Sequence, residues 1–161
     1  MKEKHLIAYM ETAYAFSECS TARRLKVGCI IVKDERIISI GYNGTPSGWD
    51  NNCESEIYST NVGEDPRLVT KPQVLHAESN AIAKLARCTE SGEGATIVCT
   101  HAPCMECAKL ILQSGIVCVI YSEDYRNPNG LEFLTKGGVK IVQAKMDVIY
   151  VDQVKTKEED K

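Results

Sequence analysis

The chain has 161 residues, of which 43% are hydrophobic and 25% are charged, so we expect one soluble globular domain over residues 1–161. Its formal net charge of −3 disfavours a protein that wraps a polynucleotide, because such proteins usually show a basic face. No apolar run approaches the roughly 18 residues of a membrane span. The first five residues lead into an amphipathic stretch without the features of a signal peptide, which predicts a cytoplasmic protein.

The first half of the chain predicts a helix, a β-hairpin and a long loop. Apolar residues recur at helical spacing over residues 3–19, which indicates an amphipathic helix. Two apolar runs, 27–32 and 36–42, are typical of strands, and the short polar segment between them predicts a hairpin turn. A turn-rich loop follows over Asn43–Gly48. Residues 49–74 show little periodicity and contain breakers, so we expect a long loop there, and long ordered loops are often functional.

The second half of the chain alternates between helical and strand-like segments. After an opening hairpin, this alternation predicts an α/β fold with a mixed sheet of about five strands and helices on both faces. A charged tail follows, which we expect to be frayed. The expected helices are 76–87, 103–114 and 130–136; the expected strands are 95–100, 116–122, 139–143 and a short final one over 146–152; the tail is 155–161.

Two short motifs carry the chemistry, His76-Ala77-Glu78 and Pro103-Cys104-Met105-Glu106-Cys107. A structural zinc site is usually closed by four protein ligands, whereas a catalytic site uses three and leaves the fourth place to water. One histidine and two cysteines are such an open set, and Glu78 follows the histidine closely enough to handle the protons of that water. This H-x-E…P-C-x-x-C order is the signature of the zinc nucleobase deaminases.

The predicted helices explain how these residues meet. Cys104 and Cys107 are three residues apart, so both thiolates lie on one helix face, near a helix N-terminus whose partial positive charge favours the ionised form. His76 also opens a helix, and two helix starts meet at the end of the sheet where ligands bind in open α/β folds. A zinc ion there would activate water at neutral pH, and Glu78 would shuttle protons to the ring nitrogen and the departing amine.

Each motif has another interpretation when it stands alone. A histidine at a helix start is often a cap, and a lone C-x-x-C is redox-active or one half of a four-cysteine zinc site. A closed structural zinc would need a fourth ligand, and His101, three residues before Cys104, is the best candidate. The joint occurrence of the motifs, in this order and on helix starts, favours a catalytic zinc.

The eight cysteines fit a reducing compartment better than a disulfide framework. Cys29, Cys99 and Cys118 fall in apolar strand-like runs, where a free cysteine behaves as a small hydrophobic residue. Cys88 ends an apolar helix. Only Cys104 and Cys107, at the start of the predicted helix 103–114, therefore have the spacing of metal ligands.

The sequence resembles the deoxycytidylate (dCMP) deaminases from about Lys26 to about Val142. The zinc motif is shared by the whole deaminase superfamily and indicates the reaction type, whereas the G-Y-N-G-x-P-x-G and H-A-E-x-N-A-I segments are more specific to the dCMP branch. The matching pieces are Val27-Gly28-Cys29-Ile30-Ile31-Val32, Gly41-Tyr42-Asn43-Gly44-Thr45-Pro46-Ser47-Gly48, His76-Ala77-Glu78-Ser79-Asn80-Ala81-Ile82 and Pro103-Cys104-Met105-Glu106-Cys107-Ala108-Lys109.

This resemblance implies a cytidine-deaminase-like three-layer α/β/α sandwich and the conversion of dCMP and water to dUMP and ammonia, which feeds thymidylate synthesis. It implies that Asn43 contacts the deoxyribose and that Tyr125 lies near the base and phosphate, with Ala77 completing the substrate-binding set. Asn43 could instead simply form the turn, and Tyr125 could be a half-buried core residue. A 5′-phosphate also needs cationic donors. The basic residues before the first strand are the candidates, with a solvated charge run as the alternative: Arg23, Arg24 and Lys26.

Two further properties of the relatives bear on this chain. Some carry a second, structural zinc; Cys19 and Cys53 occupy comparable places, but no histidine pair precedes His76, so we expect a single zinc. Many are hexamers that dCTP with Mg²⁺ activates and dTTP inhibits. The segments implicated in that regulation contain Gly44, Asn80 and Arg87, so the resemblance implies a regulated homo-oligomer, with a hexamer favoured.

Two other functions compete with dCMP deamination. The first is another zinc deaminase, acting on free cytidine, tRNA adenosine or a riboflavin precursor; the lack of a basic bias counts against tRNA, and the dCMP-type loop counts against the others. The second is a non-catalytic zinc module for nucleotide sensing or assembly. The intact Glu78 and the open ligand set disfavour that module.

Overall fold

The computed structural model describes residues 3–58, 63 and 65–146. A five-stranded sheet in the order β2-β1-β5-β6-β7 forms the centre of the molecule. Strand β1 pairs antiparallel with both β2 and β5, whereas β5, β6 and β7 are parallel to one another. The sheet is therefore mixed, as predicted. Its strands are β1 (Gly28–Lys33), β2 (Arg36–Tyr42), β5 (Thr96–His101), β6 (Cys118–Glu123) and β7 (Lys140–Gln143).

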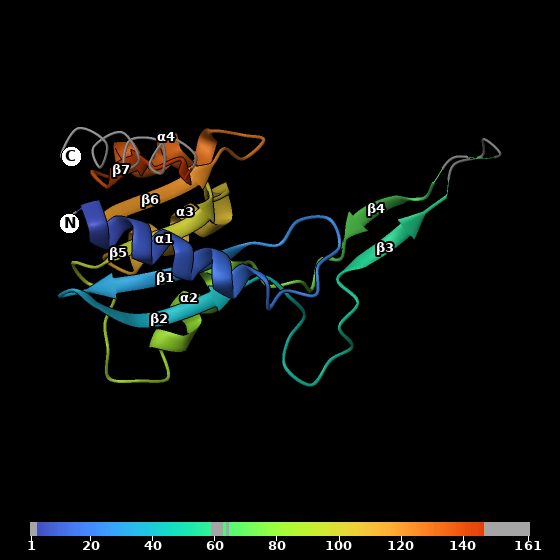
Figure 1. Cartoon of the computed structure of the whole chain (residues 1–161), viewed down its shortest axis with the longest axis horizontal. Coiled ribbons are helices and arrows are strands. Elements are labelled where there is room, and N and C mark those ends of the chain that lie inside the picture. The colour runs from blue at the N-terminus through green and yellow to red at the C-terminus, as the bar shows by residue number, and fades with distance from the viewer. Residues whose placement is uncertain (1–2, 59–62, 64, 147–161) are drawn as a thin grey trace, which may run out of the picture.

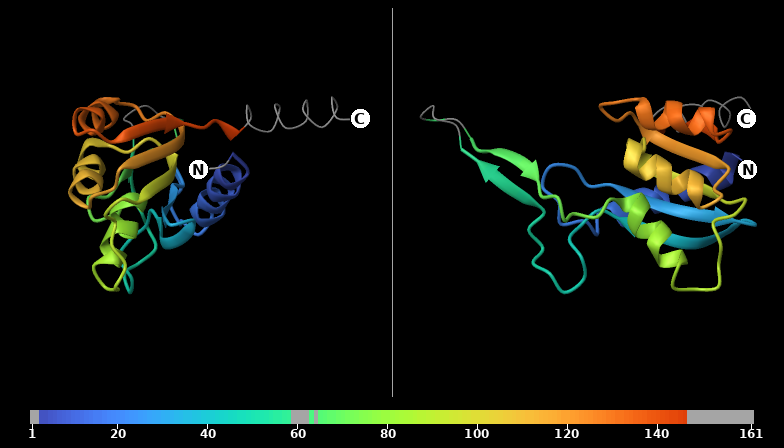
Figure 2. Two further views of the ribbon diagram at one scale, coloured as in Figure 1. Left: turned by 90° about the vertical axis from the view of Figure 1, so that its left-hand side faces the viewer. Right: turned by 180° about the vertical axis from the view of Figure 1, so that it is seen from behind.

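Helices cover both faces of this sheet, which gives the predicted three-layer α/β/α sandwich (Figures 1 and 2). Helix α1 (Glu3–Ser17) packs on one face. The other three helices pack on the opposite face, and the first two of them begin at the two motifs: α2 (Ala77–Leu85), α3 (Met105–Gln113) and α4 (Asn129–Lys136). None of the helices in the described part of the chain is long and apolar enough to cross a membrane.

The central strands are apolar on both sides because both faces are covered. In β1, Ile30 packs with Met10 of α1, whereas Ile31 belongs to the cluster on the other face with Ala81 and Ile111. All five side chains are fully buried. Burying an aliphatic side chain of the size of isoleucine contributes about 1.5–3 kcal/mol. The sheet thus gives a rigid support to the helices that carry the motifs.

Two glycines set where those helices begin. A Cβ atom at Gly41 in β2 would overlap the carbonyl oxygen of Ala77, and one at Gly130 in α4 would overlap the carbonyl oxygen of Pro103. The absence of a side chain therefore lets β2 approach the first turn of α2, and lets α4 approach the start of α3. These close approaches bring the starts of α2 and α3 to fixed places at the same end of the sheet.

The observed elements differ from the predicted ones mainly at their ends. Helix α2 begins at Ala77, with His76 as its N-cap, and α3 begins at Met105, with Cys104 as its N-cap. Pro103 therefore precedes the cap instead of occupying the first helical turn. The predicted strand over 146–152 lies outside the described residues except for residue 146, and the predicted tail lies wholly outside them.

The expectation of a long loop over residues 49–74 is wrong in one respect. Two short antiparallel strands, β3 (Glu54–Ile57) and β4 (Arg67–Thr70), form a hairpin within it. This β3–β4 arm projects away from the three-layer body (Figures 1 and 2). Each strand has only four residues and is mostly exposed, so it shows no clear alternation of apolar and polar residues that could have revealed it.

Candidate active site

The three predicted metal ligands come together at the starts of α2 and α3. The Nδ1 atom of His76 lies 3.5 Å from Sγ of Cys104 and 3.4 Å from Sγ of Cys107. The three ligand atoms all lie within 4.8 Å of one another. Tetrahedral zinc, with Zn–N near 2.0 Å and Zn–S near 2.3 Å, requires N and S ligand atoms about 3.5 Å apart. The donor set and its spacing therefore fit a zinc ion.

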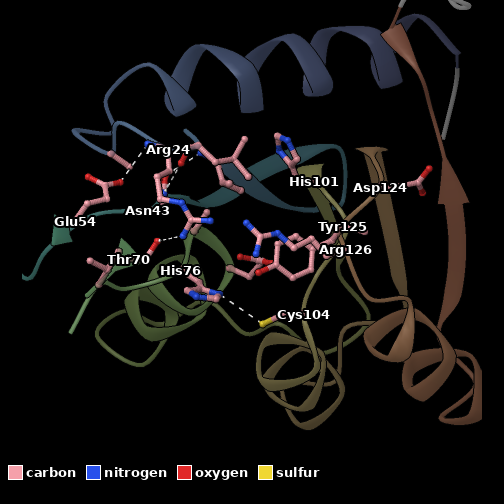
Figure 3. A pocket seen from close by; sticks show the side chains of 17 residues that line it. Arg24, Asn43, Glu54, Thr70, His76, His101, Cys104, Asp124, Tyr125 and Arg126 are labelled. Atoms are coloured by element: carbon pink, nitrogen blue, oxygen red, sulfur yellow. Dashed lines mark hydrogen bonds between the residues drawn. The ribbon is translucent and has the colours of Figure 1, made fainter. Parts of the chain in front are cut away.

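The two helices that begin at this cluster lack the usual side-chain capping hydrogen bonds at their N-termini. N-cap residues are usually Ser, Thr, Asp or Asn, whose side chains accept a hydrogen bond from the first helical turn. His76 and Cys104 occupy the two N-cap positions, and neither side chain makes a capping hydrogen bond. Their side chains point toward each other instead (Figure 3). This exchange of a cap for a ligand indicates a functional constraint at both positions.

Hydrogen bonds within the cluster set its protonation. The hydrogen bond with Cys107 lowers the pKa of Cys104 to about 3, so Cys104 is a thiolate at neutral pH. The same hydrogen bond raises the pKa of Cys107, which keeps its proton, and the hydrogen bond with Cys104 raises the pKa of His76. Hydrogen-bonded protons thus link the three ligand side chains, and a divalent metal ion would displace those protons as it binds.

Glu78 lies directly beside the cluster. It belongs to the first turn of α2, and only 4% of its surface is exposed. Burial raises the pKa of its carboxyl group above the ordinary value. A carboxyl group in this environment can both accept a proton and return it, which is the behaviour that general acid–base catalysis needs.

A cavity of about 400 Å³ opens in front of the cluster. Figure 3 shows it from close by, with His76 and Cys104 near each other and Arg24 joined to Thr70 on the neighbouring wall. The volume is typical of a small-molecule site. Its lining residues are Ala22, Arg24, Leu25, Val27, Asn43, Glu54, Thr70, Val74, His76, Ala77, Glu78, His101, Ala102, Cys104, Asp124, Tyr125 and Arg126.

Asn43, Ala77 and Tyr125, the residues expected to bind the nucleoside, all line this cavity. The Asn43 side chain also holds the wall in place: its Oδ1 accepts the Val27 N–H at 2.8 Å, and its Nδ2 donates to the Leu25 carbonyl at 2.8 Å. An amide group has two N–H donors and two lone pairs, so one of each remains for a ligand. Tyr125 is 38% exposed and belongs to the opposite wall.

The basic residues proposed for the phosphate are not placed alike. Arg24 lines the cavity, whereas Arg23 and Lys26 lie outside the lining. Arg23 is paired with Glu56 at 2.9 Å, and the Lys26 ammonium is paired with Glu18 at 2.8 Å.

Arg126 is a second lining arginine that sequence reasoning missed. It follows Tyr125 just beyond the carboxyl end of β6, the edge where parallel strands present ligand-binding loops, and that position was the available signal. Within the described residues, no ion pair involves its guanidinium. Arg24 and Arg126 therefore bring two positive charges to one cavity.

His101, the alternative fourth ligand, is not part of the cluster of ligand atoms. Its Nδ1 lies 3.0 Å from the Thr100 hydroxyl, and burial lowers its pKa. It lines the cavity instead.

Among the described residues, no second group of three or more His, Cys, Asp or Glu side chains gathers in this way; Cys19 is exposed and Cys53 is buried.

The residues expected in a regulatory site lie outside the cavity lining. Gly44 forms a bridge with Leu75, in which its N–H donates to the Leu75 carbonyl at 3.1 Å. Asn80 donates from Nδ2 to the Tyr42 carbonyl at 3.0 Å, which ties α2 to the end of β2. Arg87 is exposed just after α2.

The comparisons with known proteins agree with this site. Residues 3–123 match the family described as the cytidine and deoxycytidylate deaminase zinc-binding region. ComE operon protein 2 of Bacillus subtilis is 37% identical over 145 residues, which cover 89% of this chain and 73% of that protein. The deoxycytidylate deaminase of Saccharomyces cerevisiae is 35% identical over 136 residues, 84% of this chain and 43% of the yeast protein.

A solved structure is similar over nearly the whole described fold. The dCMP deaminase of cyanophage S-TIM5, crystallised in complex with dCMP and dUMP, has a TM-score of 0.79 and 41% identity and covers 89% of this chain and 99% of its own. Together, the mixed sheet, the three-ligand cluster and the buried carboxyl group define an enzyme of the deaminase class. The chain belongs to the cytidine and deoxycytidylate deaminase family, and the predicted resemblance is confirmed.

Proposed function

We propose that the protein converts dCMP and water to dUMP and ammonia, and so supplies dUMP for thymidylate synthesis. The observation that carries this proposal is one cavity lined by two residues of the three-ligand cluster, His76 and Cys104, together with the buried Glu78 and two arginines. The cluster and Glu78 suit hydrolytic deamination, and the arginines suit a nucleotide over a nucleoside. The relatives named as deoxycytidylate deaminases and the cyanophage complex with dCMP and dUMP support the same substrate.

His76, Cys104 and Cys107 would hold one zinc ion per chain. When bound, zinc supplies a Lewis acid that activates water for attack at neutral pH. The residues of the chain have the complementary task of placing C4 of the cytosine ring over the cluster. Ala77 contributes to the cavity wall between His76 and Glu78, and Tyr125 provides an aromatic surface on the opposite wall.

Glu78 moves the protons. As the C4–O bond forms, its carboxylate takes a proton from the attacking water and delivers it to N3 of the ring. It then transfers the second proton of that water to the exocyclic nitrogen, so that the C4–N4 bond breaks and neutral ammonia leaves. The buried position of Glu78 suits this exchange because bulk water is kept away from the transferred proton.

Arg24 and Arg126 bind the 5′-phosphate in this proposal, in place of the outward-facing Arg23 and Lys26. Charge-assisted hydrogen bonds from a guanidinium to a phosphate are among the stronger polar contacts in proteins. Asn43 keeps the 25–27 segment in place and offers its remaining donor and acceptor to the deoxyribose hydroxyl.

We also propose that the enzyme is a homo-oligomer, with a hexamer favoured, that dCTP with Mg²⁺ activates and dTTP inhibits. The bond from Asn80 to Tyr42 ties α2 to the end of β2, directly before the Asn43–Gly48 loop, and the bridge from Gly44 to Leu75 links that loop to the segment before His76. Nucleotide binding near Gly44, Asn80 and Arg87 would therefore act on the metal end of the cavity. Sedimentation and activity with dCTP–Mg²⁺ or dTTP test this coupling; identical mass and kinetics in all conditions would contradict it.

We also propose a place in the reducing cytoplasm, because none of the eight cysteines is joined in a disulfide.

The proposed reaction is tested by ammonia release from dCMP, deoxycytidine, CMP and tRNA, together with measured zinc content. We expect dCMP to give the highest kcat/KM by a wide margin. A higher value with deoxycytidine or tRNA would favour another deaminase, and no turnover by zinc-loaded protein would favour a nucleotide-sensing module.

A further inference from the structure

The β3–β4 arm contacts the cavity at the end where it joins the body. Glu54 and Thr70 are paired across the two strands at that end, and both line the cavity. Beyond this pair, β3 and β4 extend away from the three-layer body (Figure 1). The arm thus contributes one cross-strand pair to the wall that also carries Arg24 (Figure 3).

This pair holds Arg24 at two points. The Thr70 hydroxyl accepts a hydrogen bond from Nη1 of Arg24 at 3.0 Å. On the other strand, Oε1 of Glu54 accepts the backbone N–H groups of Arg23 at 3.1 Å and of Arg24 at 3.2 Å. The backbone and the guanidinium of Arg24 are therefore both fixed by the first residues of the arm.

The distribution of charge leaves Arg24 available to an anion. Arg23 is the arginine that meets the acidic groups, since its Nη1 lies 2.9 Å from Glu56 and its Nε lies 3.9 Å from Oε2 of Glu54. The guanidinium of Arg24 bonds to a neutral hydroxyl, and in the described part of the chain no carboxylate pairs with it. Its full positive charge consequently faces the cavity.

The burial of the Glu54 carboxylate costs more free energy than a purely structural contact would require. Its side chain is 1% exposed, and its Oε2 atom has no hydrogen-bond partner among the described residues. A buried carboxylate loses its hydration, and the Oε2 atom recovers part of that loss only from the half-exposed Arg23, whose Nε lies 3.9 Å away. A neutral acceptor could bond the same two N–H groups at lower cost. A role in the site therefore explains the presence of Glu54 better than a contribution to folding stability does.

We propose that Glu54 and Thr70 are positioning residues, which hold Arg24 in place for the 5′-phosphate of the substrate. This inference rests on the proposed function and adds to it the element that makes the site select a nucleotide. A free arginine side chain loses rotamer freedom when it binds a phosphate, and an arginine already fixed in the bound position loses less. The arm is then the part of the fold that prepares the phosphate site.

The substitution Thr70→Val tests the hydroxyl with almost no change of shape, and Thr70→Ser is its matched control. Loss of one hydrogen bond to a charged group predicts that Thr70→Val raises KM for dCMP by about three- to tenfold. We expect kcat to change less than about twofold because the metal end is untouched. Thr70→Ser restores the wild-type KM. The inhibition constant of dUMP should rise in parallel with KM, whereas that of deoxyuridine should not change.

A double-variant cycle with Arg24→Gln tests whether Thr70 acts through Arg24. Once Arg24 has lost its charge, adding Thr70→Val should have little further effect on KM for dCMP. Glu54→Gln keeps an acceptor for the backbone N–H groups, so it should retain more dCMP affinity than Glu54→Ala. Thr70 is exposed, so its variants fold even where Glu54→Ala does not, and the cycle remains decisive.

Two results would overturn the inference. One is an equal rise in the inhibition constants of dUMP and deoxyuridine with Thr70→Val; the other is full additivity of Thr70→Val and Arg24→Gln. A failure of the proposed function would look different. In that case the wild-type protein itself would show no preference for dCMP over deoxycytidine, before any variant is compared.

Discussion

The two ends of the cavity are built in different ways. At the metal end, the reactive groups are fixed by close packing: Glu78 is 4% exposed and Cys107 is 2% exposed. At the other end, where we propose that the phosphate binds and which we call the phosphate end, Arg24 and Arg126 are exposed, and Arg24 is held by polar contacts with an arm of two four-residue strands. In the proposed function, the chemistry therefore lies on the three-layer body, and phosphate recognition lies on exposed side chains at the base of the arm.

This difference between the two ends predicts which property of the enzyme each variant changes. Changes at the metal end should lower kcat, metal content or folding stability. Changes at the phosphate end should raise KM for the nucleotide and leave deoxycytidine turnover nearly unaffected. Each of the following substitutions tests one side of that division, from the largest expected effect to the smallest.

Removing a metal ligand should abolish activity. Cys104→Ala deletes one of the three ligand atoms, so we expect loss of the bound zinc and a rate at the level of the uncatalysed reaction. Zinc content by atomic absorption and ammonia release from dCMP are the measurements. Cys88→Ala removes an exposed cysteine outside the cluster and is the control. Full zinc content and activity in Cys104→Ala would show that the cluster is not the catalytic centre.

Glu78→Gln should separate chemistry from metal binding. The amide keeps the size of the side chain but cannot shuttle protons, so kcat for dCMP should fall by about 10²–10⁴. Zinc content and the far-UV spectrum should match wild type. Glu106→Gln neutralises a carboxylate in the first turn of α3 that is 79% exposed and paired with Lys109, and it should keep kcat. Turnover by Glu78→Gln within tenfold of wild type would remove Glu78 from the mechanism.

Gly41→Ala should disturb the metal end through packing alone. The added Cβ would overlap the Ala77 carbonyl oxygen and displace the start of α2. We expect the free energy of unfolding to fall by about 1–3 kcal/mol, as for other overpacked sites. Urea denaturation checks this value. Gly44→Ala is the control, because no atom lies within 4 Å of its added Cβ. Equal stability of the two variants would show that β2 does not fix the position of His76.

The metal end was accessible to sequence analysis because its signals are local and redundant. Four residues of three chemically specific types occur at fixed spacings: His76, Glu78, Cys104 and Cys107. Apolar runs with strand or helix periodicity place these residues at helix starts. A shift of one or two residues in the predicted ends of α2 and α3 leaves the same side chains at the same end of the sheet.

The phosphate end was less accessible because its signals are long-range. Glu54 and Arg24 are 30 residues apart, and the bond between them depends on an arm whose short strands have no apolar period. The basic run before β1 contains three candidates, and only the fold shows that Arg24 alone among them lines the cavity. Arg126, beyond β6, has no neighbouring motif of its own. Charge composition cannot say which basic side chain faces a ligand.

Arg126→Gln tests the second arginine of the phosphate end. Losing a charge-assisted contact to phosphate should raise KM for dCMP by about tenfold. The effect should shrink at high salt, because the side chain is exposed and its charge is screened. Arg36→Gln removes an exposed arginine that is paired with Glu90 and is outside the cavity lining, so it is the matched control. If both variants leave KM unchanged, Arg24 binds the phosphate without Arg126.

Lys26→Ala should have the smallest effect, although Lys26 is only two residues from Arg24. Its ammonium pairs with Glu18 at 2.8 Å on the surface, with 41% and 73% of the two side chains exposed. Such exposed pairs contribute about 0–1 kcal/mol to stability, and this one is outside the cavity lining. We expect KM for dCMP to change by less than about twofold, beside a large rise in Arg24→Gln measured in the same assay. A tenfold rise in KM that is confined to dCMP would instead show that Lys26 contacts the phosphate. The 23–26 segment would then have to change its conformation when the nucleotide binds.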